Sequence, residues 1–230
     1  MRKVTKAKKT VTKKPATKRR IAANKEPQLA AFLLLDRSAS MASIWGKAIG
    51  AVNSYVHELA QQSPEAEITL AVFDSMAGLK FEVLRRGVKA RNWRSVGEEE
   101  AYPRGNTPLY DAIGSFVGMA LRADRERSVL VIETDGYENA STAVTREGAT
   151  ALLDTCRAKG WQTIFLGANF DAMPQATSLN NLRGQTISIL PQNLEASMST
   201  LANYTASYGA CGQSIGFTGI DRARASSTTS

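Results

Sequence analysis

A carboxylate and two hydroxyls stand at alternate positions in the segment Asp36-x-Ser38-x-Ser40. They follow an uninterrupted apolar run, residues 29–35, which is typical of a strand buried on both faces. A carboxylate where such a strand ends lies at the carboxyl edge of the sheet, where open α/β folds bind their ligands. Because Mg²⁺ prefers oxygen ligands, this segment predicts one part of a magnesium site, provided that the rest of the chain supplies further oxygens.

Two further segments supply oxygens in comparable positions. Thr107 lies in the segment GNTPLYDA, on a loop that leads into a predicted helix. Asp135 follows the strand-like run RSVLVIET, as Asp36 follows the first strand. In a right-handed doubly wound sheet the two strands that end in aspartate would be neighbours. Their loops could then meet the Thr107 loop around one cation.

The elements that must position these residues alternate between strands and helices, which predicts an α/β domain. Gly78 lies in a short turn between two strands, which should therefore form an antiparallel hairpin. Thr107 is the expected N-cap of the helix that follows it. Residues 89–107 should be a loop with one short helix. Strands are expected over residues 29–35, 66–74, 79–88, 127–135, 161–169 and 185–190, and helices over 44–61, 108–123, 145–159, 171–180 and 193–209.

The charge of the chain is concentrated at its N-terminus. The 230 residues carry a net charge of +8, yet residues 1–27 alone hold eleven Lys or Arg against one acid, Glu26. The rest of the chain is therefore slightly acidic. Residues 1–27 contain no aromatic residue and no periodic apolar face, so we expect a disordered basic tail. A folded domain is expected over residues 28–209, and a polar C-terminal tail over 210–230.

The basic tail has two interpretations. It is either a solvated extension or a segment that contacts nucleic acid or an acidic protein surface. Roughly ten uncompensated positive charges would give strong, salt-sensitive binding to a phosphate backbone. The residues expected to make such contacts are Lys8, Lys9, Lys13, Lys14, Lys18, Arg19 and Arg20.

Several classes of protein lack support in the sequence. No run of about 18 apolar residues is present to span a membrane, and no apolar segment follows the basic N-terminus as in a secretory signal. The two cysteines, Cys156 and Cys211, lie far apart, which is typical of reduced thiols in the cytoplasm. With His57 as its single histidine, the chain is not expected to hold a zinc site. We expect a cytoplasmic protein without a membrane partner; a virion is also compatible.

Enzymatic activity has little support either. A phosphatase of the haloacid-dehalogenase type would need a general acid where Ser38 stands. Residues 212–216 match the G-x-S-x-G pattern of hydrolases, but no strand precedes them and no histidine follows. No P-loop sequence occurs. We therefore expect a protein that is not an enzyme.

Three segments together resemble a known family. They read LDRSASM (35–41), TPLYDAIG (107–114) and TDGYENAS (134–141). The sequence resembles a von Willebrand factor type A (VWA) domain with a metal-ion-dependent adhesion site, and is most similar to small single-domain members from bacteria and their phages. VFD (72–74) and GWQTIFLGAN (160–169) add to the agreement, so that the resemblance covers roughly residues 28–190.

This resemblance implies a three-layer, doubly wound fold with a mostly parallel six-stranded sheet, one antiparallel edge strand and the strand order 3-2-1-4-5-6. It assigns Ser38, Ser40 and Thr107 as hydroxyl ligands, and Asp36 and Asp135 as carboxylates that bind the ion directly or through water. The implied ion is Mg²⁺, with Mn²⁺ or Ca²⁺ as alternatives. A partner's Asp or Glu would take the open coordination position, which implies a non-catalytic protein-interaction module.

Other residues near the expected site leave questions open. Ala39 stands where the family usually has glycine, and a positive φ there would cost about 1 kcal/mol. Glu133 either interacts with the metal ligands without binding the ion itself, or simply lies near the end of its strand. Asp74 and Asp111 are expected to be structural. The alternative function is that of a nucleic-acid-associated or phage-virion structural protein acting through its basic tail, and a metal-dependent hydrolase is a third hypothesis.

Overall fold

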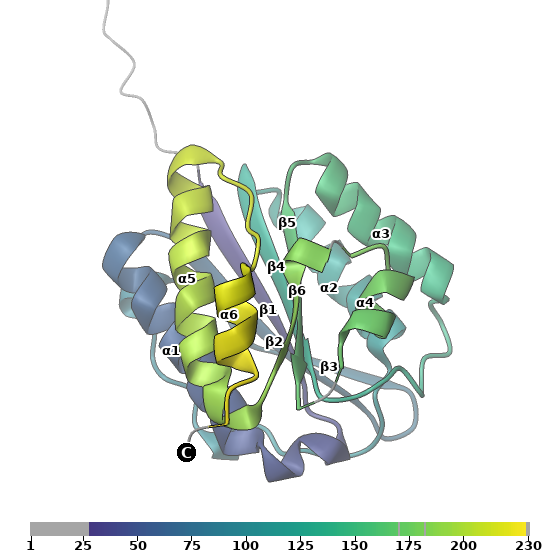
Figure 1. The fold of residues 1–230 in the computed structure, drawn as a ribbon. Coiled ribbons are helices and arrows are strands. Elements are labelled where there is room, and N and C mark those ends of the chain that lie inside the picture. The colour runs from purple at the N-terminus through teal and green to yellow at the C-terminus, as the bar shows by residue number, and fades with distance from the viewer. Residues whose placement is uncertain (1–27, 170, 182, 229–230) are drawn as a thin grey trace, which may run out of the picture.

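The computed structural model describes residues 28–169, 171–181 and 183–228. Its core is a six-stranded sheet with the order β3-β2-β1-β4-β5-β6 (Figure 1). All neighbouring strands are parallel except β2 and β3, which form an antiparallel hairpin. The predicted fold class and strand order are confirmed. The strands are β1 (Leu29–Asp36), β2 (Glu67–Ser75), β3 (Leu79–Lys89), β4 (Arg127–Thr134), β5 (Gln162–Ala168) and β6 (Thr186–Ile189).

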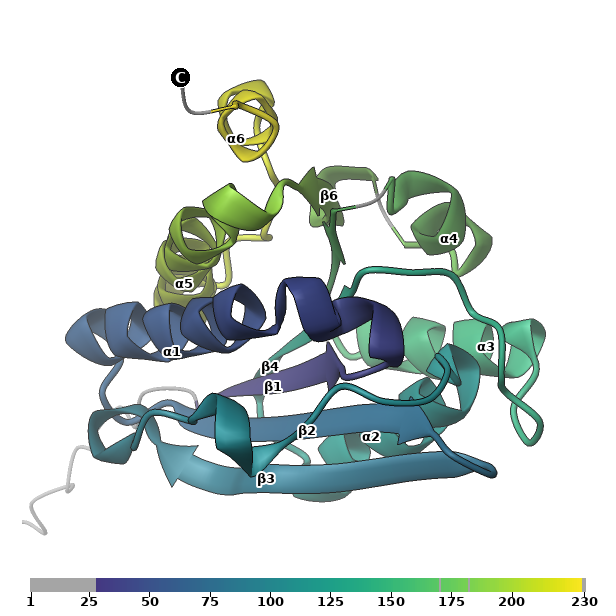
Figure 2. The same ribbon diagram turned by 90° about the horizontal axis from the view of Figure 1, so that it is seen from below.

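Helices cover both faces of this sheet (Figures 1 and 2). One hydrophobic cluster joins one face to α1 (Trp45–Gln62) and α5 (Leu194–Cys211). A second cluster joins the other face to α2 (Leu109–Ala123), α3 (Arg146–Ala158) and the short α4 (Met173–Ser178). No helix in the described part of the chain is both long enough and apolar enough to cross a membrane.

Strand β1 shows why its sequence has no polar face. Leu33 and Leu35 belong to the cluster under α1 and α5, whereas Phe32 and Leu34 belong to the cluster under α2. All eight residues of β1 are buried, because β1 lies in the middle of the sheet and both its faces are covered by helices. The uninterrupted apolar run therefore specifies a central strand and brings Asp36 to the carboxyl edge.

Two local predictions around the helices need correction. Thr107 is not the N-cap of α2; Pro108 occupies that position, and no side chain caps the helix there. Side chains from a distant loop take over this role: Glu138 accepts from the Tyr110 N–H and Ser141 from the Asp111 N–H, both in the first turn of the helix. In addition, the loop over residues 89–107 contains two short 3₁₀ helices, Ala90–Asn92 and Glu98–Glu100, and not one.

The predicted polar tail over residues 210–230 also needs correction. Residues 219–225 form α6 (Gly219–Ala225), which begins with a capping box between Thr218 and Asp221. Ile215, Phe217 and Ala225 are buried in the cluster that contains α1 and α5. This segment is therefore part of the folded domain. The predicted basic tail, residues 1–27, lies outside the described residues.

Candidate functional site

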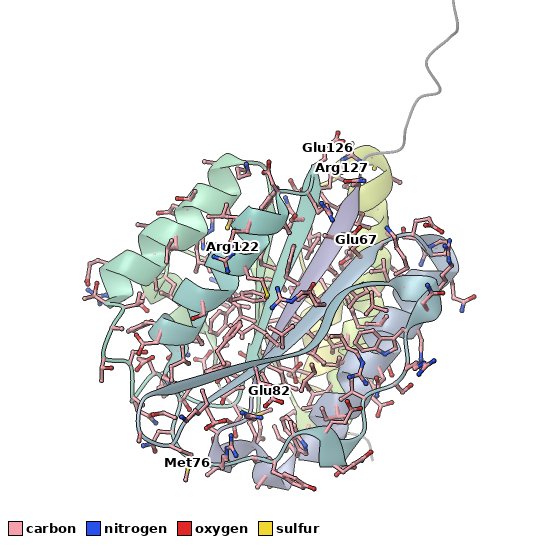
Figure 3. The ribbon with its side chains drawn as sticks, turned by 180° about the vertical axis from the view of Figure 1, so that it is seen from behind. Glu67, Met76, Glu82, Arg122, Glu126 and Arg127 are labelled. Atoms are coloured by element: carbon pink, nitrogen blue, oxygen red, sulfur yellow. The ribbon has the colours of Figure 1, made fainter. Side chains whose placement is uncertain are left out.

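The ends of β1 and β4 lie side by side at the carboxyl edge of the sheet. Leu35 pairs with Glu133, so Asp36 and the loop after Thr134 start next to each other. Figure 3 shows the two edges of the domain, with Met76 and Glu82 near the carboxyl edge and Glu126 at the opposite one. The prediction that the two aspartate-terminated strands are neighbours is confirmed.

A chain of hydrogen bonds joins four of the five predicted ligands. The Ser38 N–H donates to Asp36 Oδ1 at 2.7 Å. The Ser38 and Ser40 hydroxyls are 3.1 Å apart, and the Ser40 hydroxyl donates to Asp135 Oδ1 at 2.7 Å. The carboxylate that ends β1 and the carboxylate that follows β4 are thus bridged by two serines of one loop.

Thr107, the fifth predicted ligand, reaches the same region through its backbone. Its N–H donates to Asn139 Oδ1 at 2.9 Å, and the Asn139 N–H donates back to its carbonyl at 3.1 Å. Asn139 belongs to the loop that carries Asp135. Thr107 is buried, but across the described residues its hydroxyl makes no hydrogen bond to the other four candidates. The structure therefore brings Thr107 to the site without joining its hydroxyl to the chain of hydrogen bonds.

The carboxyl groups of Asp36 and Asp135 lack positive partners. Burial raises the pKa of Asp36 from 3.8 to about 6, although hydrogen bonds from the Thr134 hydroxyl (2.6 Å) and from Ser38 oppose the shift. Burial also raises the pKa of Asp135, opposed by the Ser40 hydroxyl. Neither residue forms an ion pair with a basic side chain of the described chain. The ionised site would thus gain stability from a bound cation.

Glu133 adds a third acid beside these two. It is 2% exposed, and neither carboxyl oxygen has a hydrogen-bond partner among the described residues. Burial first, and then repulsion from Asp36, raise its pKa from 4.5 to about 8. An unpartnered carboxyl group here is a second observation that fits a positively charged ligand close by.

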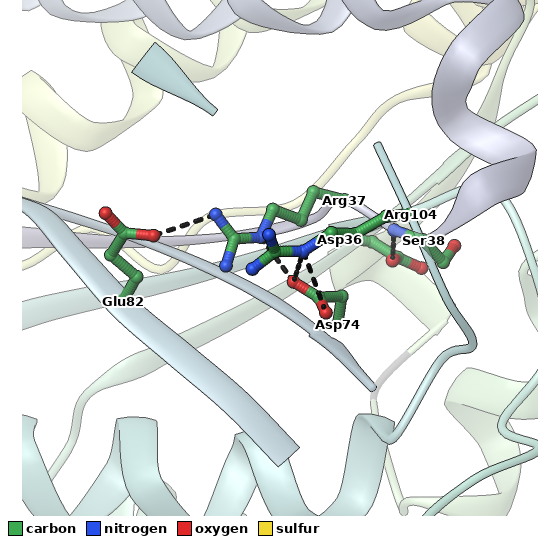
Figure 4. A network of polar contacts seen from close by, with 6 residues as sticks. All are labelled: Asp36, Arg37, Ser38, Asp74, Glu82 and Arg104. Carbon is green, nitrogen blue, oxygen red and sulfur yellow. Dashed lines mark hydrogen bonds and ion pairs between the residues drawn. The ribbon is translucent and has the colours of Figure 1, made fainter. Parts of the chain in front are cut away.

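Arg37, which lies between the candidate ligands Asp36 and Ser38, belongs to an ion-pair network (Figure 4). Arg37 is buried and donates through Nε to Asp74 at 2.5 Å and through Nη1 to Glu82 at 2.8 Å. Arg104 lies 3.4 Å from both carboxylate oxygens of Asp74. Two arginines thus neutralise Asp74, in agreement with its expected structural role. This network was not predicted from the sequence, where its only local signal is an arginine directly after Asp36.

Backbone hydrogen bonds extend this network to the Thr107 loop. The Arg104 N–H donates to the Arg37 carbonyl at 2.8 Å, and the Ala39 N–H donates to the Gly105 carbonyl at 3.1 Å. An isolated bridge between Ser75 and Asn106 holds the same loop against the end of β2. The segment that precedes Thr107 is therefore fixed directly to the Asp36–Ser40 loop.

Two other carboxylates near the site fix loops. Asp111 accepts hydrogen bonds from the N–H groups of residues 142–144, at 2.6 to 3.0 Å. Its predicted structural role fits this geometry, although the bonds go to a distant loop and not to its own helix. Glu138, which the sequence analysis did not single out, accepts from the N–H groups of Tyr110, Ala140 and Ser141. Both acids tie the loop after β4 to the start of α2.

Ala39 does not carry the conformational cost that was considered for it. It begins a 3₁₀ helix, Ala39–Ser43, and Ser38 before it has an extended backbone with φ of −61°. Ala39 is not among the non-glycine residues with positive φ in the described chain. Alanine fits this loop without strain.

The donor set at this edge fits a hard cation that keeps part of its water. Within residues 28–169, 171–181 and 183–228, no three His, Cys, Asp or Glu side chains lie close enough together to hold a metal ion by themselves. A cation here would need the hydroxyls and water in addition to the two carboxylates. Mg²⁺ binds in this manner, whereas structural zinc requires Cys or His ligands.

Comparisons with known proteins support the fold. No family model matches the sequence, and no curated protein matches it. The solved von Willebrand factor type A protein from Catenulispora acidiphila matches with a TM-score of 0.60 at 11% identity, over 78% of this chain and 43% of that chain. The vWF domain of a type V pili tip protein from Porphyromonas gingivalis gives 0.63 at 11% identity, over 84% and 99%. The manganese-loaded TRAP protein of Plasmodium vivax gives 0.54 at 17% identity, over 74% and 72%.

The chain therefore has the fold of von Willebrand factor type A domains. It spans less than half of the Catenulispora acidiphila protein but nearly the whole of the pili tip domain. The fold implied by the resemblance is confirmed, and identities this low concern the fold alone.

Proposed function

We propose that this protein is a Mg²⁺-dependent protein-interaction module that is not an enzyme. The cation would be held by Asp36, Ser38, Ser40, Thr107 and Asp135, with Mn²⁺ or Ca²⁺ as alternative ions. The observation that carries this proposal is the chain of hydrogen bonds from Asp36 through the two serines to Asp135, at an edge where these carboxylates have no basic partner.

The chemistry of these ligands explains how a partner would bind. Hydroxyls are neutral, so they leave much of the charge of a divalent cation uncompensated. A carboxylate from another protein, an Asp or Glu side chain, can then complete the coordination of the ion. The manganese-loaded TRAP protein and the pili tip domain share this fold, which supports a metal-dependent contact between proteins.

The side chains around the site do not favour catalysis. His57, the single histidine, contacts the Ser95 hydroxyl at 3.3 Å on the surface of the domain and none of the candidate ligands. Arg37, the buried basic side chain nearest to Asp36 in sequence, is already paired with Asp74. A binding role requires neither a general base nor a nucleophile.

The test is capture of partner proteins by the full chain in Mg²⁺ and in EDTA. We expect partners that are retained in Mg²⁺, released by EDTA and lost with the variant Asp36→Ala. The control Glu126→Ala removes an exposed carboxylate from the opposite edge and should retain them (Figure 3). Capture that is indifferent to both EDTA and Asp36→Ala would refute the proposal.

A second function is favoured by the charge of the N-terminus. Residues 1–27 carry eleven basic residues and one acid, which supports attachment to nucleic acid or to an acidic surface. Deletion of these residues should abolish salt-sensitive retention on a polyanion column and leave Mg²⁺-dependent capture intact. Unchanged retention of the truncated chain would exclude a role of this segment in nucleic-acid binding.

A further inference from the structure

Glu133 is the least satisfied acid in the described part of the chain. Only its two carboxyl oxygens and the Ser128 hydroxyl are buried side-chain oxygens or nitrogens without a hydrogen-bond partner there. A buried carboxyl group without a hydrogen-bond partner is unfavourable in either state, because the ion loses its hydration and the neutral acid leaves a donor and an acceptor unsatisfied. A side chain this unfavourable in the folded domain needs a partner that the described protein atoms do not supply.

The position of Glu133 indicates where that partner lies. Its strand neighbours are Leu35 on β1 and Leu166 on β5, both of which belong to the cluster under α1 and α5. Met41, from the 3₁₀ helix that contains Ser40, is buried in the same cluster. Glu133 therefore lies at the carboxyl end of this cluster, on the face that the Asp36–Ser40 loop covers.

Its electrostatic surroundings are acidic. Asp36 directly follows Leu35, the residue that pairs with Glu133, so two acids lie on adjacent strands and their ionised forms repel each other. Asp135 follows two residues later, at the start of the loop after β4. Among the described residues, no Lys or Arg forms an ion pair with any of the three. A leucine, as at the neighbouring strand positions, would avoid this repulsion, so packing alone does not explain an acid here.

We propose that Glu133 is a positioning residue of the candidate cation site. It accepts hydrogen bonds from water molecules bound to the cation, from the side that faces the interior of the domain. This inference rests on the proposed function. Direct ligation is not supported, because no three acids of the described chain are close enough together to share an ion. Mg²⁺ keeps several of its waters in proteins, and a buried carboxylate can accept their hydrogen bonds and fix their orientation. Glu133 thereby gains the partners that the protein does not supply.

The test compares cation affinity with stability in the full chain. Glu133→Gln keeps the shape of the side chain and removes its charge. Isothermal titration with Mg²⁺ and with Mn²⁺ should give an affinity at least about tenfold weaker than that of the wild-type protein. The midpoint of urea unfolding in EDTA should not fall. The control Glu126→Gln, at the opposite edge of the sheet (Figure 3), should leave both quantities unchanged.

A second variant separates this role from a structural one. Glu133→Leu should unfold in EDTA at a urea concentration at least as high as the wild-type protein, because it removes an unpaired polar group, and should also bind the cation weakly. Affinities of both variants within about twofold of wild type would overturn the inference. If the wild-type protein binds Mg²⁺ while the variants are unaffected, only the role of Glu133 is lost. If the wild-type protein itself binds no Mg²⁺, the proposed function is refuted as well.

Discussion

The ion pair between Arg37 and Asp74 should be one of the largest single contributions of a charged residue to the stability of this domain. Asp74 is fully buried and the Arg37 side chain is 4% exposed, while Glu82, the other partner of Arg37, is half-exposed (Figure 4). Asp74→Asn keeps the shape and removes the charge, which leaves a buried guanidinium poorly compensated. Breaking a buried pair from one side costs about 3–5 kcal/mol, out of a total stability of roughly 5–15 kcal/mol.

Urea unfolding followed by circular dichroism measures this loss. The matched control is Glu67→Gln, whose partly exposed ion pairs with Arg125 (2.7 Å) and Lys89 (3.2 Å) lie at the opposite edge and should contribute about 1 kcal/mol or less. The double variant Arg37→Met, Asp74→Leu should recover most of the loss, because it leaves no unpaired charge in the interior; Glu82 and Arg104, which lose their partners, are both about half-exposed. If Asp74→Asn lowers the free energy of unfolding no more than Glu67→Gln does, the Arg37–Asp74 pair does not make this contribution to the stability of the domain.

The remaining predictions concern the acids and the threonine at the site. In EDTA, the raised pKa values of Asp36 (about 6) and Glu133 (about 8) mean that the folded state binds more protons than the unfolded one. The free energy of unfolding should therefore fall as pH rises from about 4 to about 8, by roughly 3 kcal/mol for Asp36 alone. Urea unfolding at a series of pH values measures this, and a free energy that stays constant or rises over this range would contradict it. Asp111→Ala leaves three N–H groups without their acceptor and should cost about 2–4 kcal/mol in the same assay, whereas a loss below about 1 kcal/mol would mean that water replaces it. Thr107→Ala should weaken Mg²⁺ binding in calorimetry, and Thr107→Ser, which keeps a hydroxyl, should preserve it. If Thr107→Ala binds Mg²⁺ as tightly as the wild-type protein, Thr107 is not a ligand.

Several features of the fold follow from local sequence. The apolar run of β1 has no polar face, which is typical of a strand covered on both sides. The strands that precede the loops of Asp36 and Asp135 are neighbours, as expected for a right-handed doubly wound sheet. The spacing of Asp36, Ser38 and Ser40 is local, so the arrangement of this loop could be predicted from the sequence. Its connection to Asp135 follows from the order of the strands.

Other features depend on contacts between residues far apart in sequence. Arg37 and Asp74 are separated by 37 positions, and nothing near either residue shows that they pair. The N–H groups in the first turn of α2 are bonded by Glu138 and Ser141, 28 and 30 positions away, so the capping rule for Thr107 failed. The C-terminal segment has large apolar residues only at isolated positions, Ile215 and Phe217 among them, with neither helical nor strand periodicity. Its burial depends on the surface that α5 and β6 offer, which local patterns do not contain.

The most direct test of the central claim is calorimetric titration of Mg²⁺ into the full chain and into Asp36→Asn. Asparagine keeps one oxygen that can accept from the Ser38 N–H and presents an NH₂ group to the Thr134 hydroxyl, so the variant keeps the shape of the side chain while the charge is lost. The wild-type protein and Glu126→Gln should bind Mg²⁺ equally, and Asp36→Asn should bind at least about tenfold more weakly. Absence of Mg²⁺ binding by the wild-type protein, or equal binding by Asp36→Asn, would contradict a metal site at this edge of the sheet.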